Sequence, residues 1–226
     1  MKQLTHLQIS IGIATFNNSI LCFVDVAIRF NYTRPILSLD SSLDIVAGRH
    51  PIQEHIVENF IENDTSVSDT RGILLSGPNA SGKSIYLKQV ALIIYMAQIG
   101  SFVPAKSATI CLCDKILTRI QTRESVSKTS SSFMIDLNQI SIILRNYTER
   151  SLVIIDEFGK GTESSNGIGL FCAVLENLVQ SDHCPLIFCA THFHEIFAQD
   201  LFSSHLLEQK TMEIVQVGDG IDFLYR

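Results

Sequence analysis

The sequence has 226 residues, of which 46% are hydrophobic and 18% charged, and this composition excludes an intrinsically disordered chain. Its net charge is −6, whereas a duplex-binding domain usually carries an excess of basic residues. We therefore expect no direct nucleic-acid contact from this segment. No disulfide-rich cysteine spacing, signal-peptide pattern or apolar run long enough for a membrane span is present, so no membrane partner is expected.

The first thirty residues are apolar without strict alternation. Near the end of this segment the apolar residues keep helical spacing, at Leu21, Val24, Ala27 and Ile28. This spacing predicts a buried helix that ends near Asn31, before the helix-breaking pair Arg34-Pro35. Short strands are then expected around residues 36–39 and 43–46, and the polar residues 63–69 indicate a loop.

From residue 73 onward the pattern alternates between strands and helices. Unbroken apolar runs at residues 73–75, 152–155 and 186–190 predict strands that are covered on both faces. Two helices are expected between them, marked by apolar residues at helical spacing: Leu87, Val90, Ala91 and Ile94 in one, and Leu137, Ile140 and Leu144 in the other. This alternation predicts an α/β fold with a mostly parallel sheet flanked by helices.

A glycine-rich segment follows the first of these strands. Gly77-Pro78-Asn79-Ala80-Ser81-Gly82-Lys83-Ser84 matches the pattern G-x-x-x-x-G-K-[ST] at every fixed position. In such a loop, backbone N–H groups surround phosphate oxygens, the lysine contacts the β- and γ-phosphates and the serine hydroxyl binds Mg²⁺. The segment therefore predicts a nucleotide site with Lys83 as its cation and Ser84 as a metal ligand. A glycine-rich turn that fits by chance is the alternative, which the strand before it and the helix after it disfavour.

Two acidic residues follow the strand at residues 152–155. Asp156 is placed to hold Mg²⁺ through water, and Glu157 is placed to polarise the attacking water as a general base. The alternative is a solvated acidic turn.

His192 ends the next apolar strand and can reach a γ-phosphate as a sensor, although an isolated histidine there is more often structural. The nearby thiols and imidazoles match no zinc spacing: Cys184, Cys189, His192 and His194.

A run of three serines, Ser130-Ser131-Ser132, precedes the second predicted helix. Serines at a helix N-terminus with free N–H groups can form an anion site, and a helix N-cap is the alternative role.

Five separate segments together resemble the ATPase domain of the MutS family. They cover residues 77–90, 100–105, 131–134, 156–162 and 190–193, and Gly48-Arg49-His50-Pro51 resembles the segment that opens this domain. The resemblance implies an ABC-type P-loop ATPase domain over residues 34–226, preceded at residues 1–33 by the end of a helical lever.

Finer details resemble the meiotic branch of the family called MutS homologue five: Phe158, Lys160 and the segments at residues 84–90 and 133–139. This implies a clamp that pairs with a MutS homologue four-like subunit, or with itself. The clamp would bind DNA recombination intermediates through domains outside this chain. The resemblance also implies that this chain ends before the family's C-terminal dimerisation helices. ATP and Mg²⁺ are the implied cofactors. The nucleus is the implied location, although the sequence shows no basic cluster to serve as an import signal.

The resemblance also assigns roles to single residues. Ser131 or Ser132 would face the γ-phosphate of the partner subunit's nucleotide, so each site would need two chains. Thr162 and the loop that reaches Gly167 would cross the dimer interface. Phe60 resembles the aromatic residue that stacks on adenine, while composition alone also allows it a place in the core.

Two functions remain open at this point. One is an ATPase that uses its nucleotide state to switch a DNA clamp. The other is a module that binds nucleotide or a partner without significant turnover. A monomeric kinase or GTPase is disfavoured, because the sequence has no Asn-Lys-x-Asp guanine motif and no separate phosphate-acceptor site.

Overall fold

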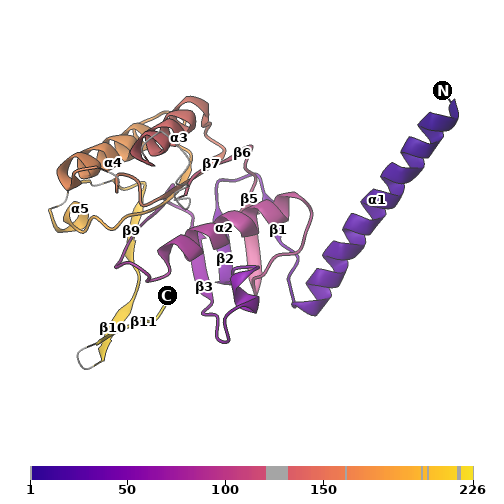
Figure 1. Ribbon diagram of the computed structural model, residues 1–226, viewed down its shortest axis with the longest axis horizontal. Helices are drawn as coiled ribbons and strands as arrows, with labels where there is room; N and C mark the ends of the chain where they lie inside the picture. The colour runs from indigo at the N-terminus through magenta and orange to yellow at the C-terminus, as the bar shows by residue number, and fades with distance from the viewer. Residues whose placement is uncertain are drawn as a thin grey trace.

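The computed structural model describes residues 2–120, 132–160, 162–199, 201–202, 204–217 and 220–225. Two sheets with their covering helices form the body of the molecule, and one long helix, α1 (Lys2–Arg29), projects from it (Figure 1). No helix within these ranges is both long and apolar enough to cross a membrane.

The prediction of a buried N-terminal helix is correct about the helix and wrong about its burial. The helix ends at Arg29, and Asn31 then adopts a left-handed backbone with φ of 52°, a conformation that commonly follows a helix end. Leu21 exposes 63% of its surface and Ile28 exposes 76%. Helical spacing identifies an apolar face, but most of its described side chains stay exposed to solvent.

The smaller sheet has the strand order β1-β5-β2-β3. Its strands are β1 (Ile36–Ser38), β5 (Ser107–Cys111), β2 (Leu43–Gly48) and β3 (Asn63–Val67). The strands expected near residues 36–39 and 43–46 are confirmed, whereas residues 63–67, expected as a loop, form a strand antiparallel to β2. Thr65 and Val67 point into the core, and a hydrogen bond of 2.9 Å between the Thr65 and Tyr86 hydroxyls satisfies the buried threonine.

The main sheet has the order β6-β7-β8-β4-β9, and all of its strands are parallel. Its strands are β6 (Lys115–Arg119), β7 (Ser151–Asp156), β8 (Leu186–Ala190), β4 (Gly72–Ser76) and β9 (Glu208–Thr211). All residues of the three central strands β7, β8 and β4 are buried, as their unbroken apolar runs predict. The expected α/β fold with a mostly parallel sheet is therefore confirmed.

Helices cover both faces of this sheet. Helix α2 (Lys83–Gln98) shares one core with Ile73 and Leu75, while α3 (Ser132–Asn146) and α4 (Ser164–Val179) share another with Leu74. Figure 1 shows α3 and α4 side by side, apart from α2. Successive residues of β4 thus enter opposite cores, as strand geometry requires.

Short elements complete the described chain. They are the 3-10 helix η1 (Gln53–His55), helix α5 (Glu195–Ala198) and an antiparallel ribbon of β10 (Ile214–Val217) and β11 (Gly220–Phe223).

The strand register aligns the carboxyl ends of the central strands. Ala190 of β8 pairs with Asp156 of β7 on one side and with Leu75 of β4 on the other. The segments that leave these three strands therefore start at one level, along one edge of the sheet, where open α/β sheets bind their ligands.

Candidate functional site

The glycine-rich segment at residues 77–84 joins the end of β4 to the start of α2. Gly82 precedes the helix with φ of 96°, a conformation that favours glycine, and Ala80 adopts φ of 65° despite its side chain. No side chain caps the N-terminus of α2, and its first turn carries no acidic residue. The free N–H groups and the helix dipole make this loop suited to bind an anion.

Lys83 lies inside the loop and is only 3% exposed. Its Nζ donates hydrogen bonds to the carbonyl oxygens of Gly77 at 2.8 Å and Pro78 at 2.9 Å. The same nitrogen is 3.8 Å from Oε1 of Glu157. Burial lowers the pKa of Lys83, and the charges of Glu157 and Asp156 oppose that shift. The structure thus places the predicted cation between the loop and the two predicted acids.

Asp156 ends β7 and is 3% exposed. Burial raises the pKa of this carboxyl group, a hydrogen bond from Ser84 lowers it, and the charge of Glu157 raises it further. Its Oδ1 is buried and has no hydrogen-bond partner among the described residues.

A buried carboxylate oxygen that lacks a partner, beside a serine hydroxyl, fits a hard divalent cation such as Mg²⁺. Within the described ranges no group of three or more histidine, cysteine or acidic side chains gathers around one point. A cation held by Ser84 and Asp156 would therefore take its other ligands from water and phosphate oxygens, as Mg²⁺ usually does.

Glu157 follows Asp156 with a left-handed backbone at φ of 52°. Its N–H donates to the carbonyl oxygen of Ala190 at 2.9 Å. Its carboxylate lies between two ammonium groups, with Oε2 3.1 Å from Nζ of Lys160 and Oε1 near Lys83. A carboxylate fixed at the sheet edge in this way has the chemistry to accept a proton from a water molecule.

His192 stands two residues beyond β8, at the same edge. Its ring packs against Phe193 with centroids 4.2 Å apart, and its Nδ1 is buried without a partner among the described residues. Burial lowers the pKa of His192, the charge of Glu157 opposes this, and the charges of Lys160 and Lys83 add to it. The imidazole therefore favours its neutral form and lies within electrostatic reach of the predicted acid.

The other predicted contacts are not gathered here. Phe60 is half-buried between η1 and β3, and no hydrogen bond or ring contact joins it to the loop among the described residues. Ser131 lies outside the described residues, as does the side chain of Ser132 at the start of α3.

The sequence analysis did not identify one aromatic residue that lies near the loop. A Cβ on Gly82 would stand 3.1 Å from Cδ1 of Tyr225, so this ring lies directly against the loop. The Tyr225 carbonyl oxygen accepts a hydrogen bond of 3.1 Å from Nδ2 of Asn63. No local motif marks Tyr225, because its place depends on how the end of the chain packs.

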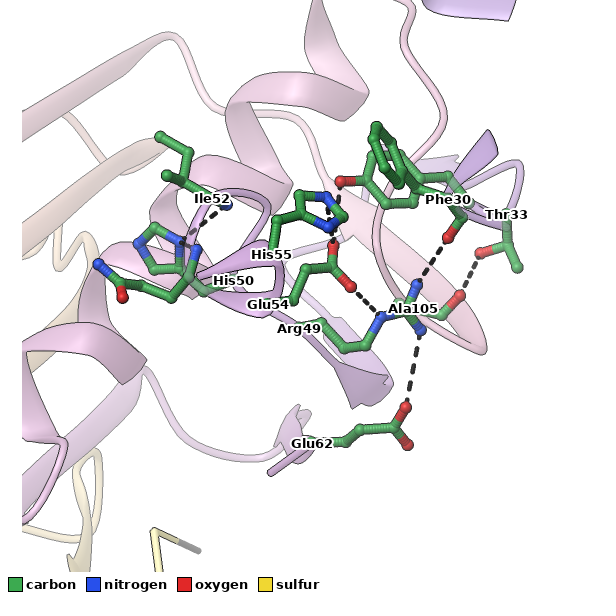
Figure 2. A network of polar contacts seen from close by, with 11 residues as sticks. Phe30, Thr33, Arg49, His50, Ile52, Glu54, His55, Glu62 and Ala105 are labelled. Carbon is green, nitrogen blue, oxygen red and sulfur yellow. Dashed lines mark hydrogen bonds and ion pairs between the residues drawn. The ribbon is translucent and has the colours of Figure 1, made fainter. Parts of the chain in front are cut away.

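A polar network centred on Arg49 joins Phe30, the residue after α1, to Glu62 (Figure 2). Arg49 pairs with Glu54 at 2.6 Å and with Glu62 at 3.7 Å, and it donates a hydrogen bond of 3.3 Å to the carbonyl oxygen of Phe30. The Phe30 ring lies 4.0 Å from the His55 ring, centroid to centroid. The segment predicted to open the domain is therefore the point where α1 is attached to the body.

Known proteins match this chain over most of its length. The family model described as MutS domain V matches residues 73–226. MutS protein homolog 5 of Saccharomyces cerevisiae is 40% identical over 92% of this chain and 26% of its own length. The DNA mismatch repair protein MutS of Clostridioides difficile is 40% identical over 99% of this chain and 23% of its own length.

A third relative, the DNA mismatch repair protein MutS of Clostridium novyi, is 43% identical over 76% of this chain and 19% of its own length. The chain thus spans about a quarter, or less, of the curated relatives that it matches. The matched domain contains the loop, the acidic pair and the strand-end histidine described above. The chain belongs to the MutS family.

Proposed function

We propose that this chain binds ATP with Mg²⁺ and hydrolyses it, and that the bound nucleotide switches a MutS-type DNA clamp in meiotic recombination. Membership of the MutS family supports the proposal. The observation that carries it is the meeting of the loop lysine with the two acids at one sheet edge, where Nζ of Lys83 is 3.8 Å from Oε1 of Glu157.

The loop and its neighbours divide the work of binding. The N–H groups at the start of α2 and the ammonium of Lys83 bind the β- and γ-phosphates. Ser84 and Asp156 would hold Mg²⁺, and the bound ion would neutralise charge on the phosphate oxygens. Phe60 is proposed to stack on the adenine base, in keeping with its resemblance to the family's aromatic residue.

Glu157 acts as the general base. It takes a proton from water as the water oxygen bonds to the γ-phosphorus and the bond from phosphorus to the bridging oxygen breaks, which yields ADP and phosphate. Lys83 and Lys160 hold the carboxylate in place. His192, kept neutral by burial, contacts the γ-phosphate and senses its loss.

The complete site is proposed to need two chains. Ser131 and Ser132 would reach the γ-phosphate bound by a partner, which is either a MutS homologue four-like subunit or a second copy. Residues 34–226 would form the ATPase domain and residues 1–33 the end of the lever, consistent with a helix that ends at Arg29 and leaves the body. DNA would be contacted by domains outside this chain, in the nucleus.

The first test separates hydrolysis from binding. Glu157→Gln should lower ATP turnover by about 100-fold or more, the usual contribution of a general base. Its affinity for a fluorescent ADP analogue should stay within a factor of about 3, because the loop is unchanged. Glu176→Gln, an exposed position on α4, is the matched control and should keep wild-type turnover.

Turnover should be measured on the chain alone and with a MutS homologue four-like subunit, at several protein concentrations. A steep rise with added partner supports the composite site. Equal turnover in the wild type and in Glu157→Gln would contradict the assignment of this chain as an enzyme. Nucleotide binding without turnover in every mixture would leave a binding module.

A further inference from the structure

We infer that Arg119 is a positioning residue for the site, one that fixes the peptide between Asp156 and Glu157 and ties it to helix α3. The inference deepens the proposed function and rests on it. Arg119 is the last residue of β6, and in the parallel register it pairs with Ile155, next to the acidic pair.

The guanidinium makes two contacts inside the protein. Nη1 of Arg119 donates to the backbone carbonyl oxygen of Asp156, and Nη2 forms an ion pair with Oδ2 of Asp136. The Arg119 side chain is 2% exposed, and its Nε is buried without a partner among the described residues. Burying such a group costs free energy, and an apolar side chain often serves stability as well or better. Stability alone therefore gives no reason for an arginine here.

The contact with Asp156 completes a clamp on one peptide unit. Arg119, from β6, holds the C=O of the peptide that links Asp156 to Glu157, and Ala190, from β8, accepts the N–H of the same peptide. This peptide leads directly into the left-handed backbone of Glu157. A strained conformation persists only where its surroundings fix it. The clamp therefore sets the direction of both carboxylates, one toward Ser84 and the other toward Lys83.

The contact with Asp136 links this clamp to another element. Asp136 lies one turn inside α3, the helix that begins at Ser132 and is proposed to face the partner's nucleotide. A displacement of α3 would move Asp136, and the ion pair would carry the Arg119 guanidinium with it. The carbonyl of Asp156 would then shift as well. The geometry thus gives the partner-facing helix a direct mechanical connection to the hydrolytic acids.

The test uses the full chain with Arg119→Met, which keeps an apolar stem in the buried slot, and Arg119→Lys. Arg145→Met, at an exposed position on α3, is the control. Arg119→Met should lower kcat about 100-fold, the usual cost of a misplaced catalytic group. It should also raise the Mg²⁺ concentration needed for half-maximal binding of the fluorescent ADP analogue by about 10-fold, the usual effect of losing an outer-shell partner.

A positioning role predicts a split between readouts. The affinity for nucleotide at saturating Mg²⁺ should stay within a factor of about 3, because the loop is untouched, and Arg119→Lys should restore part of kcat. A variant with unchanged kcat and unchanged Mg²⁺ dependence would overturn the inference. So would a loss of nucleotide affinity in parallel with kcat and Tm, because that pattern means a general structural role.

Two further outcomes are separable. If Arg119→Met does not fold, Asp136→Asn removes the anchor alone: lower kcat at unchanged nucleotide affinity supports the inference, and unchanged kcat overturns it. If the wild type binds nucleotide without turnover, the proposed hydrolysis fails, and the Mg²⁺ dependence of binding still decides the role of Arg119. A wild type that binds no nucleotide overturns both.

Discussion

At the scale of single residues, the site holds a charge that the fold itself disfavours. Asp156 is buried, its pKa is raised by that burial, and one of its oxygens lacks a partner among the described residues. A folded-state pKa above the ordinary value means that the ionised form opposes folding. This penalty is absent below a pH of about 3.8, the ordinary pKa, and complete above the raised pKa.

Asp156→Asn should therefore stabilise the chain in the absence of nucleotide while abolishing Mg²⁺-dependent turnover. We expect its Tm at neutral pH to rise by roughly 2–4 °C, the shift that 1 kcal/mol produces in a chain of this size. The gain should shrink as the pH falls toward 3.8. Thermal unfolding across pH checks this, with the exposed Asp182→Asn as control. A lower Tm for Asp156→Asn at neutral pH would contradict the reasoning.

How far the site could be predicted depends on where each residue stands in the chain. The loop and the pair Asp156-Glu157 follow recognisable strands, so their local patterns were sufficient to predict that they lie together. Arg119 and Tyr225 belong to no such pattern. The position of Arg119 depends on β6 lying beside β7, and that of Tyr225 on the packing of the chain end against Gly82. Strand order and end packing are tertiary facts that one sequence does not display.

At the scale of elements, the loop after β7 packs against the first turn of α4 through two glycines. Gly159 has φ of 93°, and a Cβ on Gly167 would stand 2.5 Å from the Gly159 carbonyl oxygen and 2.9 Å from Cζ of Phe193. No side chain fits between these backbones. The approach of α4 therefore fixes the loop that carries Lys160 beside the acidic pair.

Gly167→Ala should separate the loop from α4, with a loss of roughly 1–3 kcal/mol in the free energy of unfolding and a drop in turnover. Gly169→Ala, in the same helix, is the matched control, because a Cβ there meets nothing within 4 Å. That substitution should stabilise the chain by roughly 0.5–1 kcal/mol, the helix preference of alanine over glycine, and leave turnover unchanged. Thermal unfolding and turnover on both variants check this; equal behaviour would contradict the close contact.

The elements themselves were predictable to different degrees. The central strands of the main sheet were predictable because both of their faces are covered and each contains an unbroken apolar run, at residues 73–75, 152–155 and 186–190. Strand β3 was missed because Asp64 and Ser66 are exposed and Thr65 is polar, and the partner that satisfies Thr65 is Tyr86 on a distant helix. A polar strand of this kind becomes recognisable only when its partners are known.

At the scale of the whole molecule, α1 stands apart from the body. Phe16 exposes 65% of its surface, and most of the large apolar residues after it are exposed as well, whereas Phe23 and Val26 are half-buried. The described contacts with the body lie just after the last residue of α1, where Arg49 and Glu54 bind Phe30 and Tyr32.

Deletion of residues 2–24 should therefore leave the Tm of the body within about 2 °C of the full chain, since the contacts with the body described above lie beyond residue 24. The same deletion should reduce self-association, because it removes the exposed apolar side chains of Phe16, Leu21 and Val24. Thermal unfolding and light scattering test the two effects. A large fall in Tm would mean that α1 packs against the body in solution.

Because α1 is long, a small tilt at its base produces a large displacement at its far end. Its 28 residues span roughly 42 Å at about 1.5 Å per residue. A tilt of about 5° at its base moves its far tip by roughly 4 Å over that length, more than the span of a hydrogen bond. The base of the helix is the network around Arg49, which also binds Glu62, two residues after Phe60. A rearrangement too small to disturb the packing of the body would thus suffice to make or break contacts some 40 Å away.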